Sequence, residues 1–146
     1  MSKRDLERMS LLARIKRLEE RLCAQEFSKV RKNIVSVEDR IGQVNEEKGA
    51  VFRCIEDSFL TSNMEEVNRY YDYANYLEKE KDTLISRLEE LKKEEELKRA
   101  ELEKKMQKRK IFENLKDRKE EHIINWINKE FQKTLDDIII SRWNKV

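Results

Sequence analysis

Apolar residues recur at heptad spacing along the first half of the chain. From Phe27 onward, one register is filled by valines seven residues apart: Val30, Val37, Val44 and Val51. The second register holds Ile34, Ile41 and Ile55, with Lys48 in the one place where an isoleucine is missing. β-Branched residues in two alternating registers of a heptad predict a left-handed coiled coil.

A similar stripe precedes this seam, formed by Leu11, Ile15, Leu18 and Leu22. The step from Leu22 to Val30 is eight residues, one more than a heptad. We therefore expect the leucine stripe to continue the seam, with a stutter that shifts it between these two positions.

The pattern stops near residue 60 and restarts a few residues later. Ser62 followed by Glu65 has the spacing of a capping box, in which each side chain bonds the other residue's backbone amide. Asn63 followed by Glu66 offers the same chemistry one residue on. We predict a first helix over about 4–59, a turn at about 60–63 and a second helix over about 64–144. The second helix has its own apolar stripe: Val67, Tyr70, Ala74, Leu77, Leu84, Leu88 and Leu91.

Two helices joined by so short a turn must run antiparallel. The predicted fold is all-α: a single coiled-coil domain of residues 1–146, in which the second helix is longer than the first. A turn near residue 62 pairs residue i with a residue near 124 − i. The seam weakens between Leu91 and Ile111, where most side chains are charged.

The pairing leaves the end of the second helix uncovered. About 25 residues extend past the start of the first helix, and they are rich in large apolar side chains. Exposed apolar surface of this kind usually marks an interaction site. The members of this apolar set are Phe112, Leu115, Ile123, Ile124, Trp126, Ile127, Phe131, Leu135, Ile138, Ile139, Ile140 and Trp143.

Composition agrees with long helices, because the 146 residues hold no proline and two glycines and 44% of them are charged. Gly42 and Gly49 lie inside the first predicted helix. Close approach of a ring such as Tyr76 would explain Gly49, and tolerated helix glycines are an equal alternative. Residues 1–32 carry ten basic and five acidic groups, whereas residues 33–66 carry three and eight. We expect a basic end that attracts an acidic partner.

The chain offers little for catalysis. His122 is the one histidine and has no second ligand at metal-binding spacing, and no glycine-rich phosphate loop is present. We expect no enzyme, cofactor or metal site. Basic runs interrupted by acids argue against nucleic-acid binding. No apolar run of about 18 residues or signal-peptide core is present, so the expected location is the cytoplasm.

Several segments resemble one family. Leu115–Arg118 is similar to an L-x-x-R motif, and Glu130–Asp137 followed by Arg142 is similar to an E-x-K-x-L-D-E segment with a late arginine. Tyr73–Lys79 is similar to an aromatic-x-x-x-Leu-Glu motif. Together with the two-helix organisation over the whole chain, these segments resemble the FliJ family, the coiled-coil component of the flagellar type III protein export apparatus. Asp137 stands where the family usually has Glu, and the N-terminus departs from the family's Phe-led start.

The resemblance implies a stalk similar to the rotary ATPase γ subunit. It implies binding to the hexameric, FliI-like export ATPase, whose assembly and coupling the stalk promotes, and association with export chaperones. We expect the ATPase contact at Arg118, Trp126, Phe131, Leu135 and Trp143. The resemblance also implies binding to the FlhA-like export gate protein through Tyr73 and Leu77, at the inner membrane of the flagellar base.

Two other interpretations remain open. The chain can be the equivalent stalk of a virulence type III secretion system, or a structural coiled coil that self-associates. An elongated monomer is expected of a stalk, and a stable oligomer of a structural coiled coil.

Overall fold

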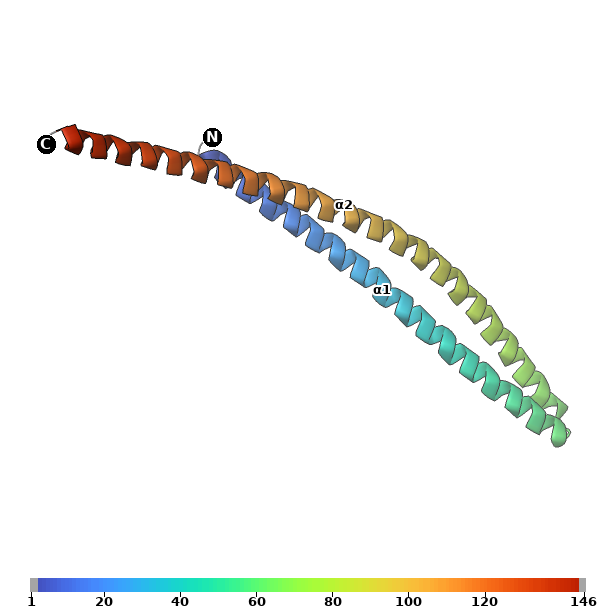
Figure 1. The fold of residues 1–146 in the computed structure, drawn as a ribbon. Helices are drawn as coiled ribbons and strands as arrows, with labels where there is room; N and C mark the ends of the chain where they lie inside the picture. The colour runs from blue at the N-terminus through green and yellow to red at the C-terminus, as the bar shows by residue number, and fades with distance from the viewer. Residues whose placement is uncertain (1–2, 145–146) are drawn as a thin grey trace. The chain divides into compact units, whose positions relative to one another are not determined.

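The computed structural model describes residues 3–144, which form two α-helices joined by a three-residue turn (Figure 1). Helix α1 is Lys3–Leu60 and helix α2 is Met64–Asn144, with 58 and 81 residues. Within the described residues there is no strand. The predicted all-α fold with a longer second helix is confirmed, and the predicted helix bounds differ by one residue at each end of α1.

The turn closes α1 with a Schellman motif. Ser62 has φ of 57°, the left-handed conformation that usually favours glycine after a helix end. The amide of Asn63 donates to the carbonyl of Ser58 at 3.2 Å, and the amide of Ser62 donates to the carbonyl of Phe59 at 3.1 Å. These two bonds satisfy carbonyls that the helix end leaves without a partner.

Asn63 then caps α2. Its side-chain oxygen accepts from the amide of Glu66 at 3.2 Å, and its side-chain nitrogen donates to the Glu66 carboxylate at 3.2 Å. The predicted capping box at Ser62 and Glu65 is therefore wrong. The reason is that Ser62 is used by the left-handed end of α1, so α2 starts one residue after it. Of the alternative box one residue later, only the half in which the Asn63 side chain accepts from the Glu66 amide is formed, because the Asn63 amide donates to Ser58.

The chain divides into two compact units: Ala24–Glu101, here called the hairpin unit, and Met1–Cys23 with Leu102–Val146, here called the terminal unit. The prediction of a single coiled-coil domain remains a prediction. The hairpin unit has an apolar seam, in which Lys48 forms an ion pair with Glu78 in place of an apolar contact. Its buried apolar residues are Val30, Ile34, Val44, Val51, Ile55, Val67, Ala74, Leu77 and Leu91.

The antiparallel register agrees with the expected pairing in both units. In the hairpin unit Leu91 packs with Val30 and Ile34, and Lys98 Nζ lies 3.1 Å from the Glu26 carboxylate. In the terminal unit Lys105 Nζ lies 3.3 Å from the Glu19 carboxylate.

The first segment of α1 does not follow the predicted leucine stripe. Ala13, which is 2% exposed, faces α2, whereas Leu11, Ile15, Leu18 and Leu22 are all exposed. Counting back from Val30 in heptads reaches half-buried Cys23, Lys16 and Met9, so no stutter occurs at Leu22. The prediction that the stripe forms the seam is wrong, because α1 is one unbroken helix and keeps the frame that its valines set.

Neither glycine of α1 is explained by close packing. A Cβ atom built on Gly42 or Gly49 meets no heavy atom within 4 Å. The contact with Tyr76 is therefore absent, and both positions are tolerated helix glycines.

Candidate interaction surfaces

The end of α2 is uncovered, as the sequence predicts. Every residue from Ile124 to Asn144 is exposed, and Figure 1 shows α2 continuing past the start of α1 within the terminal unit. We call Ile124–Asn144 the overhang. Of the predicted ATPase-binding residues, Trp126, Phe131, Leu135 and Trp143 lie in it, and Trp143 is 81% exposed. Arg118 lies on α2 shortly before the overhang begins, and it is also exposed.

The overhang residues do not share one face. At about 100° per residue, Phe131 and Leu135 fall on one stripe, whereas Trp126 and Trp143 project from other sides of the helix. Sequence reasoning missed this grouping, although the spacing of three and four residues signals it. The apolar stripe of the overhang consists of Ile124, Ile127, Phe131, Leu135 and Ile138.

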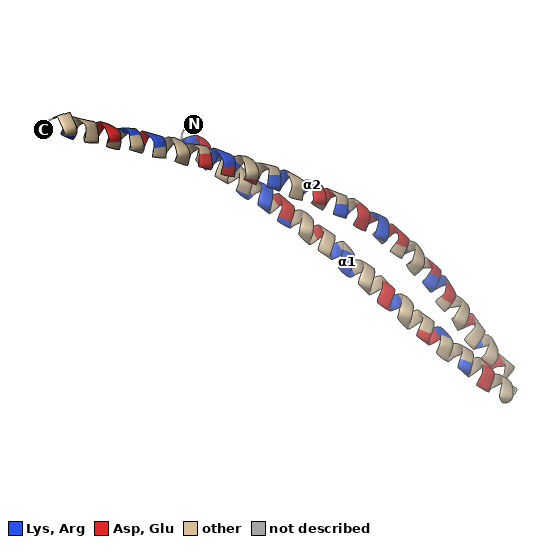
Figure 2. Cartoon of the chain, viewed as in Figure 1, with Lys and Arg blue, Asp and Glu red and all other residues tan. Residues whose placement is uncertain are grey.

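Charged side chains hold the rest of the terminal unit together. Arg17 Nε lies 2.7 Å from the Glu113 carboxylate, and Arg109 pairs with Glu20 and Glu113. Lys16 lies over the ring of Phe112, 5.5 Å from its centroid, so the prediction that α1 leaves Phe112 uncovered is wrong. Figure 2 shows residues of both signs on α1 and α2. The basic stretch of α2 is therefore partly neutralised by α1.

These contacts favour the charged forms. The hydrogen bond from Lys105 lowers the pKa of Glu19, and the hydrogen bond from Arg17 lowers the pKa of Glu113. The hydrogen bond to Glu20 raises the pKa of Arg109. All of these groups border solvent, so each pair contributes little alone and is screened by salt.

The two residues predicted to bind the export gate differ in exposure. Leu77 is 1% exposed and packs in the apolar core of the hairpin unit with Val44 and Ala74. Tyr73 is 44% exposed, and its hydroxyl donates to the Glu47 carboxylate at 3.4 Å. The negative charge of Glu47 raises the pKa of the Tyr73 phenol. Leu77 therefore positions the helix, and Tyr73 is the member that a partner can reach.

Tyr73 has an aromatic neighbour that the sequence analysis did not assign to this surface. The ring of Tyr76 stacks beside it, with centroids 6.2 Å apart and an interplanar angle of 15°. Tyr76 is 62% exposed. Exposed tyrosines on one helix are suited to protein contacts, because each combines apolar area with a hydroxyl.

Two further kinds of feature, a metal-binding cluster and a membrane-spanning helix, were sought in the described residues. Residues 3–144 contain no cluster of three or more histidine, cysteine or acidic side chains placed to hold a metal ion. No described helix combines the length and the apolarity that crossing a bilayer requires.

Comparison with protein families matches residues 5–146 to FliJ, described as "Flagellar FliJ protein". The chain belongs to the FliJ family. No curated protein and no solved structure matches it. The family match spans nearly the whole chain, including both helices and the overhang. This FliJ-family protein is therefore a flagellar protein connected with protein export.

Proposed function

We propose that this FliJ-family chain is the stalk of the flagellar export apparatus and engages the hexameric export ATPase through its overhang. It has no catalytic role in this proposal and acts in the cytoplasm, next to the inner membrane at the flagellar base. The observation that carries the proposal is the uncovered apolar overhang at the end of a chain that the family match assigns to the flagellum.

Energetics support a partner for the overhang. Large apolar side chains forgo about 1.5–3 kcal/mol each when they remain in water, and aromatic residues are frequent anchors of protein interfaces. The stripe containing Phe131 and Leu135 has the spacing to pack against a groove or loop. Trp126 and Trp143 would contact other parts of the partner, as expected for a helix end that enters the hole of a ring.

Charge supports the same end of the molecule. The terminal unit has 19 basic and 12 acidic residues, net +7, whereas the hairpin unit has 14 and 19, net −5. Arg118, Lys104, Lys108 and Lys110 form no ion pair with any described residue. An acidic rim on the ATPase ring would attract this end.

The remaining partners follow from the family. We assign the export gate contact to exposed Tyr73, supported from below by buried Leu77 and beside it by Tyr76. Association with export chaperones belongs to the same proposal. The flagellar family match favours this apparatus over a virulence secretion system.

Removal of the overhang tests the proposal. A chain that ends after Ile123 keeps all residues that α1 covers, so we expect unchanged helicity per residue in α1 and an unchanged melting temperature. Stimulation of the purified export ATPase should be lost, and swimming should stop in cells that carry only this chain.

A pair of matched variants locates the contact within the overhang. Phe131→Asp with Leu135→Asp removes two residues of the stripe, and Ile139→Asp with Ile140→Asp changes two exposed residues outside it. The first variant should reduce ATPase stimulation at least tenfold, and the second should retain most of it. Full stimulation by the shortened chain would overturn the proposal.

A further inference from the structure

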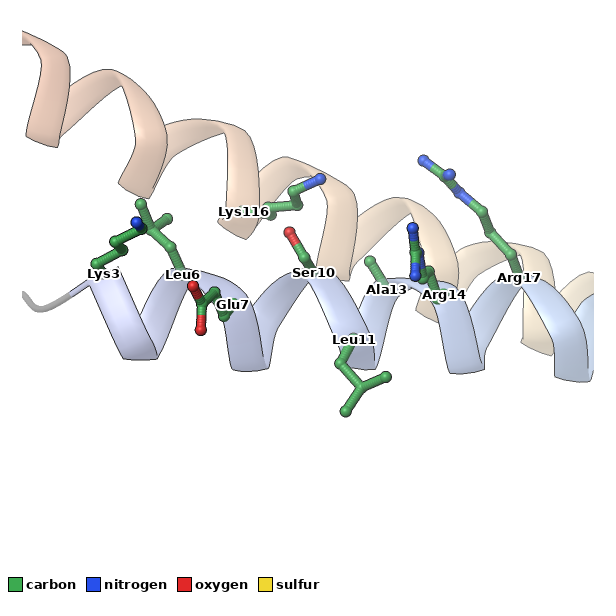
Figure 3. Close-up of a pocket in the computed structure, with 9 residues that line it drawn as sticks. All are labelled: Lys3, Leu6, Glu7, Ser10, Leu11, Ala13, Arg14, Arg17 and Lys116. Atoms are coloured by element: carbon green, nitrogen blue, oxygen red, sulfur yellow. The ribbon is translucent and has the colours of Figure 1, made fainter.

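The leucine stripe on the first part of α1 has no partner within the terminal unit. We call Leu11, Ile15, Leu18 and Leu22 the outer stripe. Each of these residues is between 43% and 57% exposed. Figure 3 shows Leu11 directed away from α2, while Ser10 and Ala13 are directed toward it. At about 100° per residue, the outer stripe lies nearly opposite the face that packs on α2.

The spacing of the outer stripe is that of a coiled-coil seam. Its members follow at steps of four, three and four residues, which assigns Leu11 and Leu18 to d positions and Ile15 and Leu22 to a positions. The residues that face α2 then fall on b, c and f positions. This segment of α1 thus carries two seams, of which the structure fills the more polar one.

Charges of both signs flank the outer stripe, with Asp5 and Glu19 at e positions. Two acids of this segment, Glu19 and Glu20, form ion pairs with Lys105 and Arg109 of α2. The bases Lys3, Arg4, Arg8, Arg14 and Arg21 form no ion pair with any described residue. Arg14 and Arg21 occupy successive g positions beside the stripe, with Glu7 one heptad before them.

We propose that the outer stripe of α1 is a docking site for an acidic amphipathic helix of another protein, which packs as a third helix. Apolar a and d residues of that helix cover Leu11, Ile15, Leu18 and Leu22. Its acidic residues face Arg14 and Arg21, since charges at e and g positions select coiled-coil partners. The surface is separate from the overhang.

The pattern distinguishes this partner from two other occupants. A membrane surface is matched by a broad apolar face, whereas the four residues of the outer stripe span about 60° of the helix and only Leu12, at an e position, adds exposed apolar area beside them. A second copy of the chain would bring Arg14 and Arg21 against the same arginines, because a two-fold interface pairs identical surfaces. An acidic helix satisfies the apolar row and the unpaired arginines together.

Two synthetic peptides test the proposal on the full chain. Both have four heptads with isoleucine at a and leucine at d; one has glutamate at e and g, and the other has lysine. At low salt we expect the glutamate peptide to bind at least tenfold more tightly than the lysine peptide. Arg14→Glu with Arg21→Glu should reverse this preference, and Ile15→Ser with Leu18→Ser should weaken glutamate-peptide binding at least tenfold.

Control variants separate a site from general charge and hydrophobicity. Arg69→Glu with Lys92→Glu changes two exposed bases of the hairpin unit, and Val35→Ser changes an exposed apolar residue of α1. Both should bind the glutamate peptide as the unchanged chain does. The serine variant of the outer stripe should keep its helicity and melting temperature, because its two side chains make no core contact.

Five results would overturn the proposal. The first two are that the glutamate peptide does not bind the chain at all, and that it binds the serine variant as well as it binds the unchanged chain. The serine variant loses helicity, which would mean that the stripe packs inside. Phosphatidylglycerol vesicles bind the chain through Ile15 and Leu18, which would make the surface a membrane contact. The chain forms a dimer that the serine variant dissociates, which would make it a self-association surface.

Discussion

At the scale of single residues, Ser62 decides how the chain reverses. It provides the left-handed residue that ends α1, which lets Asn63 cap α2 directly afterwards. A residue other than glycine costs about 1–2 kcal/mol in this conformation. The sequence signals a turn here, but two adjacent capping boxes are equally good in the one-dimensional pattern. The choice between them depends on backbone geometry that spacing does not contain.

Replacement of Ser62 by glycine should stabilise the protein. Glycine removes the strain of the left-handed conformation, and its larger conformational entropy in the unfolded chain offsets part of the gain. We expect the free energy of unfolding to rise by about 0.5–1 kcal/mol in urea denaturation. Ser28→Gly, in the exposed middle of α1, is the matched control and should lower the same quantity by about 0.5 kcal/mol. Equal signs for the two variants would contradict the strain argument.

Tyr73 permits a test of the gate contact that does not disturb the fold. Its ring is half-exposed and touches Tyr76 and Glu47 and not the apolar core. Tyr73→Ala should therefore leave the melting temperature nearly unchanged and reduce binding to the purified cytoplasmic domain of the export gate protein about tenfold. Tyr71→Ala changes another tyrosine of equal exposure and serves as the control. If both variants bind the gate normally, Tyr73 is a surface residue without this role.

At the scale of helices, hydrophobicity alone predicts the wrong packing face for the first part of α1. The leucine stripe is the more apolar of the two faces, so a single-helix analysis assigns it to the seam. The hairpin unit contributes nine buried apolar residues and sets the rotation of α1, and an unbroken helix transmits that rotation to Ala13. The seam of the hairpin unit was predictable because its sequence pattern and its partner face agree. The seam of the terminal unit was not, because its one fully buried apolar residue is the small Ala13 and much of the contact between α1 and α2 there is made by ion pairs between distant segments.

The ionic seam should make the terminal unit more sensitive to acid than the hairpin unit. The pKa values of Glu19 and Glu113 are lowered in the folded chain, so their contribution to stability is complete above the ordinary value of 4.5. It is lost as the pH falls through the lowered pKa values. The pKa of Glu78 in the hairpin unit is lowered in the same way, so its contribution to stability is also lost in acid. The apolar residues of that unit nevertheless keep their contacts, because they carry no charge.

Two pairs of spin labels follow the two units separately. Labels at Arg21 and Lys108 report on the terminal unit, and labels at Gln43 and Asp82 report on the hairpin unit; all four positions are exposed. Between pH 7 and pH 3 the distance distribution of the first pair should broaden, and that of the second should change little. Raising the salt concentration at pH 7 should have a weaker effect of the same kind. Equal broadening of both pairs would contradict an ionic seam.

At the scale of the whole molecule, composition determines the balance between binding and self-association. The overhang and the outer stripe both leave large apolar residues exposed, and both belong to the terminal unit. Exposed apolar area of this kind favours oligomers. The net charge of +7 on the same unit opposes any dimer that places two terminal units together. Apolar surface on a basic background favours a different, acidic partner over a second copy.

We therefore expect the free protein to be a monomer at micromolar concentration and about 0.15 M salt. Sedimentation equilibrium measures mass irrespective of shape, and it should give the 17.8 kDa of a single chain. A salt series identifies the cause of any association that does occur. Association through the overhang or the outer stripe should increase with salt, since screening weakens the repulsion between terminal units. Association between a terminal unit and the acidic hairpin unit of another copy should decrease. A dimer that persists at low and high salt alike would contradict the stalk and support the structural coiled coil.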